Sequence, residues 1–185
     1  HLVITSSSNI SQHVITDQRI AGVAFTGSCT AAHAINALLA SRNNIIVPLI
    51  AETGGQNAMI VDSSALLEQV TDDVLTSSFY SAGQRCSALR MLYVQEEIYD
   101  KLLEMIKGAT ELLKIGDTSD FAVDIGPVID QKSRDMLEAH IQDMKKKGFT
   151  VYEHPQNGVS KDGHFFYPHI IEVSSINDIS DEKFG

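Results

Sequence analysis

Cys86 combines a reactive side chain with a position at which α/β proteins display nucleophiles. It follows the turn-forming Gly83 in the segment 81–87 (SAGQRCS) and precedes a β-prone run. A loop at the mouth of a sheet can present a thiol in this way, and a nearby cation such as Arg85 favours the thiolate. The same pattern fits a small buried hydrophobic residue, so both interpretations stay open.

Glu52 is the second candidate reactive group. It follows the nearly continuous apolar run Ile45 to Ala51 and precedes the glycine pair Gly54 and Gly55. Such a run predicts a strand buried on both faces of a parallel sheet, and catalytic groups gather at the carboxyl edge of such sheets. Glu52 is therefore a candidate general base, although a solvated or helix-capping glutamate shows the same pattern.

The segment 25–28 (FTGS) is a third candidate, for phosphate binding. A β-prone run is followed by Gly27, Ser28 and an alanine-rich helical stretch. Free amides and the dipole at a helix N-terminus can bind a phosphate. Only Gly27 of the glycines in a full dinucleotide fingerprint is present, so a purely structural turn is the alternative.

Strands and helices are predicted to alternate around these residues. Beyond the Ile45 to Ala51 run, strands are expected at 2–5, 22–26, 57–61, 89–94 and 150–152. Helices are expected at 28–41, from the cap candidates 62–64 to before Gly83, and around 98–113 and 137–148. Polar residues from Pro155 to Gly163 predict a surface loop. This alternation indicates an α/β fold, a parallel sheet with flanking helices and right-handed crossovers.

Composition excludes several classes of protein. The 185 residues carry 14 basic and 24 acidic side chains, a net charge of -10 that disfavours binding to nucleic acid or an anionic membrane. There is no apolar run of about 20 residues, as a membrane span needs, and no signal-peptide pattern. Only Cys29 and Cys86 are present, which favours a reducing, cytoplasmic setting over a disulfide framework. The seven histidines show no metal-ligand spacing, and no metal is predicted.

The order of the motifs resembles the aldehyde dehydrogenase superfamily. FTGS at 25–28 resembles its phosphate turn, ETGGQN at 52–57 its general-base segment, and GQRCS at 83–87 its nucleophile segment, with Cys86 lying 34 residues after Glu52. IGPVID at 125–130, HFFYP at 164–168 and EKFG at 182–185 extend the resemblance along essentially the whole chain.

The resemblance implies a role for each matching residue. The Cys86 thiolate attacks an aldehyde, with its backbone N–H stabilising the oxyanion, and Glu52 activates the water that hydrolyses the thioester. NAD is the implied cofactor, with Gly27 and Ser28 at its pyrophosphate. Two further residues are implied near the nicotinamide: Glu182 at its ribose and Phe184 packed close by.

Within the family, SAGQRCSALR at 81–90 and IGPVID look like the glutamate-semialdehyde (1-pyrroline-5-carboxylate) dehydrogenases. The similarity is greatest to the dehydrogenase module of bifunctional proline utilisation A proteins. It implies L-glutamate 5-semialdehyde as substrate, with Ser87 at its carboxylate, and a homo-oligomeric parent protein. Any FAD would belong to a separate proline dehydrogenase domain. Another aldehyde dehydrogenase, such as a succinate-semialdehyde enzyme, a non-catalytic module with the same fold, and a thiol redox protein remain alternatives.

The family pattern also predicts the domain organisation. Residues 1–51 are expected to be the end of a Rossmann-like cofactor domain, and 52–185 a catalytic domain incomplete at its C-terminus. Because the chain looks cut at both ends, the family's oxyanion asparagine and adenosine-binding lysine are expected upstream of His1, and the isolated chain is expected to be inactive. The turn after Gly27 lacks the family's glutamate and last glycine, and Cys29 occupies a threonine position as a structural thiol.

Overall fold

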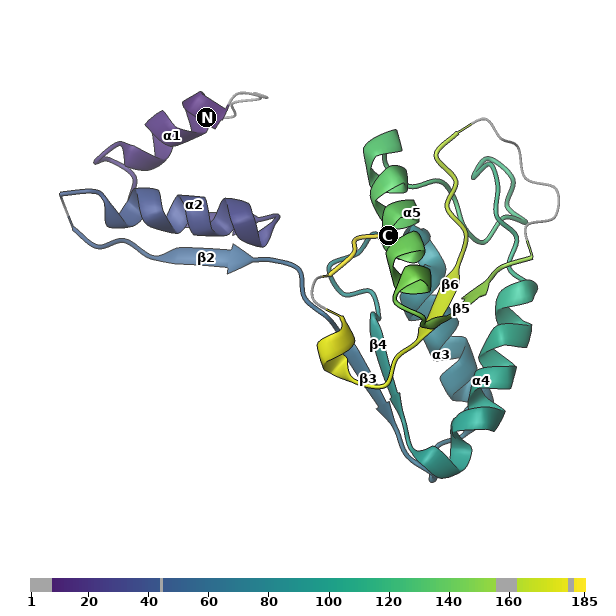
Figure 1. Ribbon diagram of the computed structural model, residues 1–185. Helices are drawn as coiled ribbons and strands as arrows, with labels where there is room; N and C mark the ends of the chain where they lie inside the picture. Colours follow the sequence, from purple (N-terminus) through teal and green to yellow (C-terminus); the bar gives the residue numbers. More distant parts are fainter. Residues whose placement is uncertain (1–7, 44, 156–162, 180–181) are drawn as a thin grey trace. The chain divides into compact units, whose positions relative to one another are not determined.

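The computed structural model describes residues 8–43, 45–155, 163–179 and 182–185. The chain folds as two compact units, unit 1 (His1–Gly54) and unit 2 (Gly55–Gly185). The expected strand at 2–5 and most of the expected loop at 155–163 lie outside the described residues. Figure 1 shows the elements of each unit.

In its described residues, 8–43 and 45–54, unit 1 contains two helices and a two-stranded parallel sheet. Its elements are α1 (Ser8–Thr16), β1 (Val23–Thr26), α2 (Cys29–Ala40) and β2 (Leu49–Glu52). The register of the sheet pairs Val23 with Leu49 and Thr26 with Glu52. The predicted strand, turn and helix around Gly27 are confirmed, and Ser28 caps α2 by accepting a hydrogen bond from the Ala31 N–H at 3.2 Å.

The expectation of a strand over Ile45 to Ala51, buried on both faces, was wrong in part. The strand begins only at Leu49, because Pro48 has no N–H to donate to a ladder. Ile45 and Ile46 are 78% and 96% exposed. A continuous apolar run is buried on both faces only where other layers cover the sheet. The described residues of unit 1 leave most of β2 exposed.

Unit 2 is larger and contains two layers of strands with helices. Its elements are β3 (Ala58–Val61), α3 (Leu67–Phe79), the 3₁₀ turn η1 (Tyr80–Gly83), β4 (Met91–Val94), α4 (Glu96–Glu111), α5 (Gln131–Lys146), β5 (Thr150–Glu153), β6 (His169–Glu172) and η2 (Ile176–Asp178). Strands β3 and β4 are parallel, and α3 connects them. This is the predicted strand, helix, strand arrangement.

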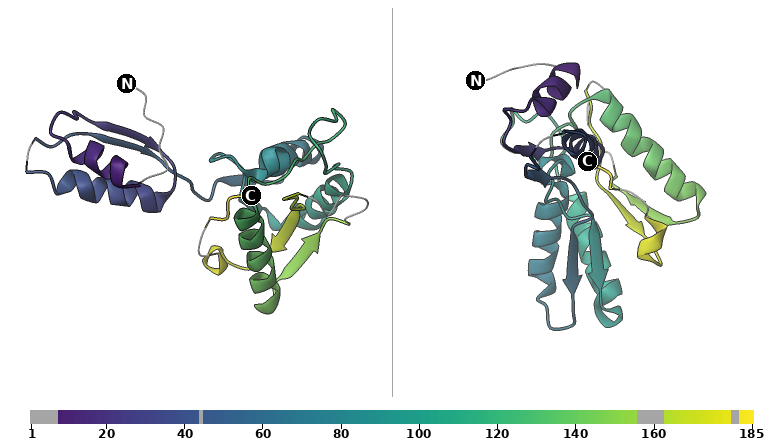
Figure 2. Two further views of the ribbon diagram at one scale, coloured as in Figure 1. Left: turned by 90° about the horizontal axis from the view of Figure 1, so that it is seen from above. Right: turned by 90° about the vertical axis from the view of Figure 1, so that its left-hand side faces the viewer.

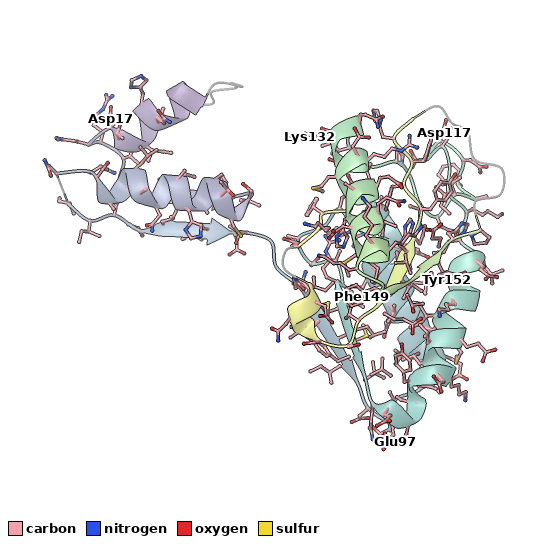
Figure 3. All side chains as sticks on the ribbon, viewed as in Figure 1. Asp17, Glu97, Asp117, Lys132, Phe149 and Tyr152 are labelled. Atoms are coloured by element: carbon pink, nitrogen blue, oxygen red, sulfur yellow. The ribbon has the colours of Figure 1, made fainter. Side chains whose placement is uncertain are left out.

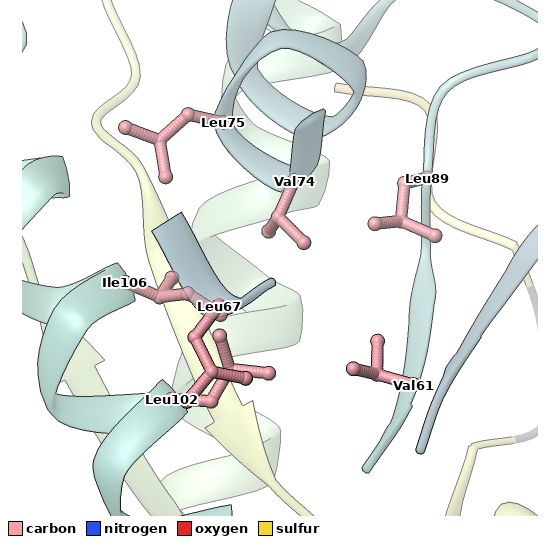
Figure 4. Close-up of a cluster of buried hydrophobic side chains, with 7 residues drawn as sticks. All are labelled: Val61, Leu67, Val74, Leu75, Leu89, Leu102 and Ile106. Carbon is pink, nitrogen blue, oxygen red and sulfur yellow. The ribbon is translucent and has the colours of Figure 1, made fainter. Parts of the chain in front are cut away.

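The main core of unit 2 forms where α3 and α4 pack together against β3 and β4. Its buried members, drawn in Figure 4, are Val61, Leu67, Val74, Leu75, Leu89, Leu102 and Ile106. The helical spacing of Val70 and Val74, and of Ile98, Leu102 and Ile106, predicts α3 and α4 correctly. The expected caps of α3 were wrong. Its N-cap is Leu66, whereas the Asp62 carboxylate accepts hydrogen bonds from the N–H and hydroxyl of Ser64 in the preceding turn.

The remaining layer of unit 2 consists of α5 with β5 and β6, which lie beside each other in both views (Figures 1 and 2). Asp130 caps α5 by accepting from the Ser133 N–H at 2.7 Å, and Gly148 ends it with a φ of 87°. The parallel pairing seen in β1–β2 and β3–β4 does not extend to β5 and β6, which are antiparallel. No helix lies in the described part of the connection between them, and a parallel pair normally needs a helical crossover.

Candidate active site

The segment before Cys86 turns sharply at the end of α3. Ser81, Ala82 and Gly83 all have left-handed backbone conformations, with φ of 60°, 51° and 64°. Such conformations are unfavourable for residues other than glycine and concentrate at functional sites. A Cβ atom at Gly83 would lie 2.8 Å from the backbone carbon of Gly185. Gly83 is therefore required both by its φ and by the close approach of another segment.

Cys86 lies in an exposed turn just after this bend. The turn is closed by the Ala88 N–H, which donates to the Arg85 carbonyl at 3.1 Å. The side-chain amide of Asn57, at the start of β3, donates to the backbone carbonyls of Cys86 at 2.7 Å and of Ala88 at 2.9 Å. The thiol is thus accessible on a backbone fixed from both sides, and exposed Ser87 lies next to it.

Gln84 ties the same loop to the 125–130 segment. Its Oε1 atom accepts a hydrogen bond from the Ile129 N–H at 2.8 Å, and its Nε2 atom donates to the Ser81 carbonyl at 3.2 Å. The Arg85 Nε atom donates to the Ser81 hydroxyl at 3.0 Å. Gln84 and Asn57 were part of the predicted motifs, but their contribution to the geometry of the loop was missed, because motif spacing carries no information about side-chain partners.

Glu182 and Phe184 meet the segment after Cys86 around Arg90. The Arg90 guanidinium lies 3.8 Å from Glu182 Oε1 and 5.6 Å from the centre of the Phe184 ring. Among the described residues, Glu182 Oε1 is buried without a hydrogen-bond partner. A buried carboxylate oxygen with a free acceptor position is suited to a hydroxyl group of a ligand.

Gly27, Ser28 and Glu52 lie together in unit 1. The Gly27 N–H donates to the Glu52 carbonyl at 3.0 Å, which places the turn before α2 beside the end of β2. A Cβ atom at Gly27 would lie 2.5 Å from the tip of the Phe25 ring, so a side chain at this position would displace that ring. The Glu52 side chain is exposed in unit 1, and Cys29, in the first turn of α2, is exposed as well.

Each unit has one group of residues with features suited to a cofactor. The first N–H groups of a helix have no partner within it, so the start of α2 offers donors and a positive dipole to a pyrophosphate. Glu182 Oε1 offers a free acceptor to ribose hydroxyls. The turn at Gly27 and Ser28 therefore suits a phosphate group, and, separately, the Glu182 carboxylate suits a hydroxyl group.

The described residues contain neither a candidate metal site nor a membrane-spanning helix. No group of three or more His, Cys, Asp or Glu side chains there could hold a metal ion. In the same part of the chain, no helix is long and apolar enough to cross a membrane.

The chain thus combines an α/β fold with an exposed thiol on a constrained loop. Residues 1–185 match the aldehyde dehydrogenase family, and the chain belongs to that family. The family assignment and the fold made from the motifs are therefore confirmed. Members of the family use NAD(P).

Three comparisons place the chain within the family. It is 47% identical to "Bifunctional protein PutA" of Klebsiella aerogenes over 178 residues, 92% of this chain and 14% of PutA. A solved structure of a Bradyrhizobium japonicum Proline Utilization A (PutA) mutant shares 48% identity and a TM-score of 0.89, covering 98% of this chain and 18% of that one. Identity to the Escherichia coli "Succinate-semialdehyde dehydrogenase [NADP(+)] GabD" is 32% over all of this chain and 38% of GabD. The chain thus spans a small part of each of these relatives.

Proposed function

We propose that the protein carrying this chain oxidises L-glutamate 5-semialdehyde, the open form of 1-pyrroline-5-carboxylate, to glutamate in proline catabolism. The observation that carries the chemistry is the exposed Cys86 on a loop held by Asn57 at 2.7 Å. The substrate assignment is supported by 47% identity to a PutA, compared with 32% to a succinate-semialdehyde dehydrogenase.

Cys86 acts as the nucleophile in this proposal. Its thiolate attacks the aldehyde carbon, and the electron pair of the carbonyl moves to oxygen, where the Cys86 backbone N–H stabilises the oxyanion of the thiohemiacetal. A bound NAD would supply the acceptor for the hydride that leaves this carbon as the thioester forms. Glu52 then removes a proton from a water that attacks the resulting thioester, and the Cys86 thiolate leaves. Ser87 donates a hydrogen bond to the substrate carboxylate.

The proposed function implies a domain organisation, a location, an assembly and a cofactor. Residues 1–51 form the end of a Rossmann-like cofactor domain and 52–185 part of the catalytic domain. The reaction takes place in the cytoplasm, in a homo-oligomer, and any FAD binds a separate proline dehydrogenase domain. The cofactor is NAD, and the chemistry requires neither metal nor nucleic acid.

NADH formation followed at 340 nm in the natural protein tests the proposal. Glutamate semialdehyde is expected to be the preferred substrate over succinate semialdehyde and a simple aliphatic aldehyde. Cys86→Ala is expected to abolish turnover, whereas Cys29→Ala, which removes the chain's other thiol, is expected to retain it. Preference for another aldehyde would refute the substrate, and loss of cysteine dependence would refute the mechanism and favour a non-catalytic module.

A further inference from the structure

Arg90 is a mostly buried arginine between β4 and the turn of residues 85–88 that carries Cys86, here called the nucleophile turn. Its side chain is only 11% exposed. Its guanidinium donates to the Gly185 carbonyl through Nη1 and to the Arg85 carbonyl through Nη2, each at 3.4 Å. It also lies 3.8 Å from Glu182 Oε1 and over the ring of Phe184.

These contacts connect two segments that are far apart in the sequence. One ends in the nucleophile turn at Arg85, and the other is the 182–185 segment. An arginine suits this position because its planar group carries five donors and also stacks on aromatic rings. A lysine would place the same charge on a single ammonium group, without the planar array of donors that lets an arginine contact several partners at once.

Arg90 attracts the Glu182 carboxylate, but the Oε1 atom of that carboxylate keeps its capacity to accept a hydrogen bond. At 3.8 Å, the Arg90 charge attracts the Glu182 carboxylate without a hydrogen bond, and among the described residues Glu182 Oε1 has no other partner. An acceptor that is buried, held by a cation and still free is suited to a ligand. An arginine with a purely structural role would be expected to satisfy its carboxylate directly.

We propose that Arg90 is a positioning residue that holds Glu182 and Phe184 beside the nucleophile segment and thereby shapes the nicotinamide end of the cofactor site. The cofactor part of this inference rests on the proposed function. The ordering of the 182–185 segment by Arg90 does not rest on the proposed function, so it can be tested separately.

The test compares Arg90→Met, Arg90→Lys and the matched control Arg134→Met in the natural protein. Arg134, on α5, contacts the Gly163 carbonyl instead. Amide hydrogen exchange of the peptide containing residues 182–185 is expected to quicken in Arg90→Met, to lie between wild type and Arg90→Met in Arg90→Lys, and to match wild type in Arg134→Met. The KM for NAD is expected to rise roughly tenfold in Arg90→Met, with a smaller change in the KM for the aldehyde.

Each outcome decides one part of the proposal. Unchanged exchange at 182–185 in both Arg90 variants would refute the positioning role, whether or not the protein turns over aldehydes. Faster exchange with an unchanged KM for NAD, in a protein with cysteine-dependent turnover, would refute the link to the cofactor. If wild type has no such turnover, the proposed function fails, and the exchange result alone decides the positioning role. If Arg90→Met does not fold, Arg90→Lys supplies both measurements.

Discussion

The side-chain amide of Asn57 donates to the backbone carbonyl of Cys86 at 2.7 Å. The same amide reaches the Ala88 carbonyl at 2.9 Å, and the Asn57 carbonyl accepts the N–H groups of Arg90 and Met91, each at 3.0 Å. One residue at the start of β3 therefore fixes the turn that carries the thiol and the entry into β4. The position of Cys86, the proposed nucleophile, therefore depends on a partner 29 residues upstream.

Replacing Asn57 is expected to impair catalysis more than cofactor binding. Asn57→Ala removes two hydrogen bonds, an exposed one to the Cys86 carbonyl and a part-buried one to the Ala88 carbonyl, which should lower the free energy of unfolding by about 1–3 kcal/mol. A misplaced thiol should lower kcat roughly 10- to 100-fold. Asn57→Asp should be at least as damaging, because a carboxylate presents acceptors to two carbonyl oxygens. Steady-state kinetics and urea unfolding of both variants provide the measurement.

The matched control for Asn57 is Asn177→Ala, at an exposed position of η2. It should retain the wild-type kcat and free energy of unfolding within error. A wild-type kcat in Asn57→Asp would show that the two side-chain hydrogen bonds do not position the nucleophile.

Gly83 is expected to tolerate no side chain. Its φ is +64°, and a Cβ atom would lie 2.8 Å from the Gly185 carbon and 3.1 Å from the Ser78 carbonyl oxygen. Gly83→Ala should therefore lower the free energy of unfolding by about 1–2 kcal/mol from the backbone conformation alone, and more from the contact with Gly185. Thermal and urea unfolding measure the loss.

The control for Gly83 uses a glycine in the opposite situation. Gly108 lies within α4, and no atom lies within 4 Å of the place its Cβ would occupy. Gly108→Ala should raise the free energy of unfolding by roughly 0.5–1 kcal/mol. Equal effects at the two positions would contradict the conformational argument.

Two tyrosines that join α4 to the antiparallel strands predict a fall in stability at high pH. Tyr99 donates to Glu172 at 2.7 Å, and Tyr152, labelled on β5 in Figure 3, donates to Glu111 at 2.9 Å. Burial, reinforced by the neighbouring carboxylates, raises the pKa of Tyr99 and of Tyr152 from 10.0 to about 12.

The sign of this pH effect follows from the direction of the shift. A raised pKa means that the unfolded chain loses its tyrosine protons first, so stability present below pH 10 is lost as the pH rises to about 12. Urea unfolding should show a steeper decline over this range in wild type than in the double variant Tyr99→Phe, Tyr152→Phe. The exposed Tyr93→Phe is the control, and parallel declines in wild type and double variant would contradict the prediction.

Local patterns predicted much of the fold. Apolar spacing predicted α3, α4 and α5, and β-prone runs predicted β1, β3, β4 and β5, because these signals lie within each segment. Helix α1 was missed, since the polar and β-branched residues of 8–16 give no clear helical pattern. Strand β6 and its antiparallel pairing were also missed, because pairing is decided between distant segments.

The candidate site, like the fold, could be predicted from the sequence only in part. Motif order pointed to Cys86 and Glu52, and the structure adds that Cys86 lies exposed on a fixed turn, while the catalytic roles of both residues stay predictions. The cluster of Arg90 with Glu182 and Phe184 could not be predicted, because its contacts join segments up to 95 residues apart. A lone arginine in a β-prone run gives no signal of such a partner.

The core of unit 2 should be sensitive to the loss of a buried side chain. Leu102 on α4 is 0% exposed and lies within the buried cluster of Figure 4. Leu102→Ala should lower the free energy of unfolding by about 2–5 kcal/mol, since it removes buried methyl groups and leaves a cavity. Leu112→Ala, just after the same helix and 80% exposed, should change it by less than about 0.5 kcal/mol. Urea unfolding of both variants measures the difference, and comparable losses would mean that this cluster is not the core that stabilises the nucleophile-bearing unit.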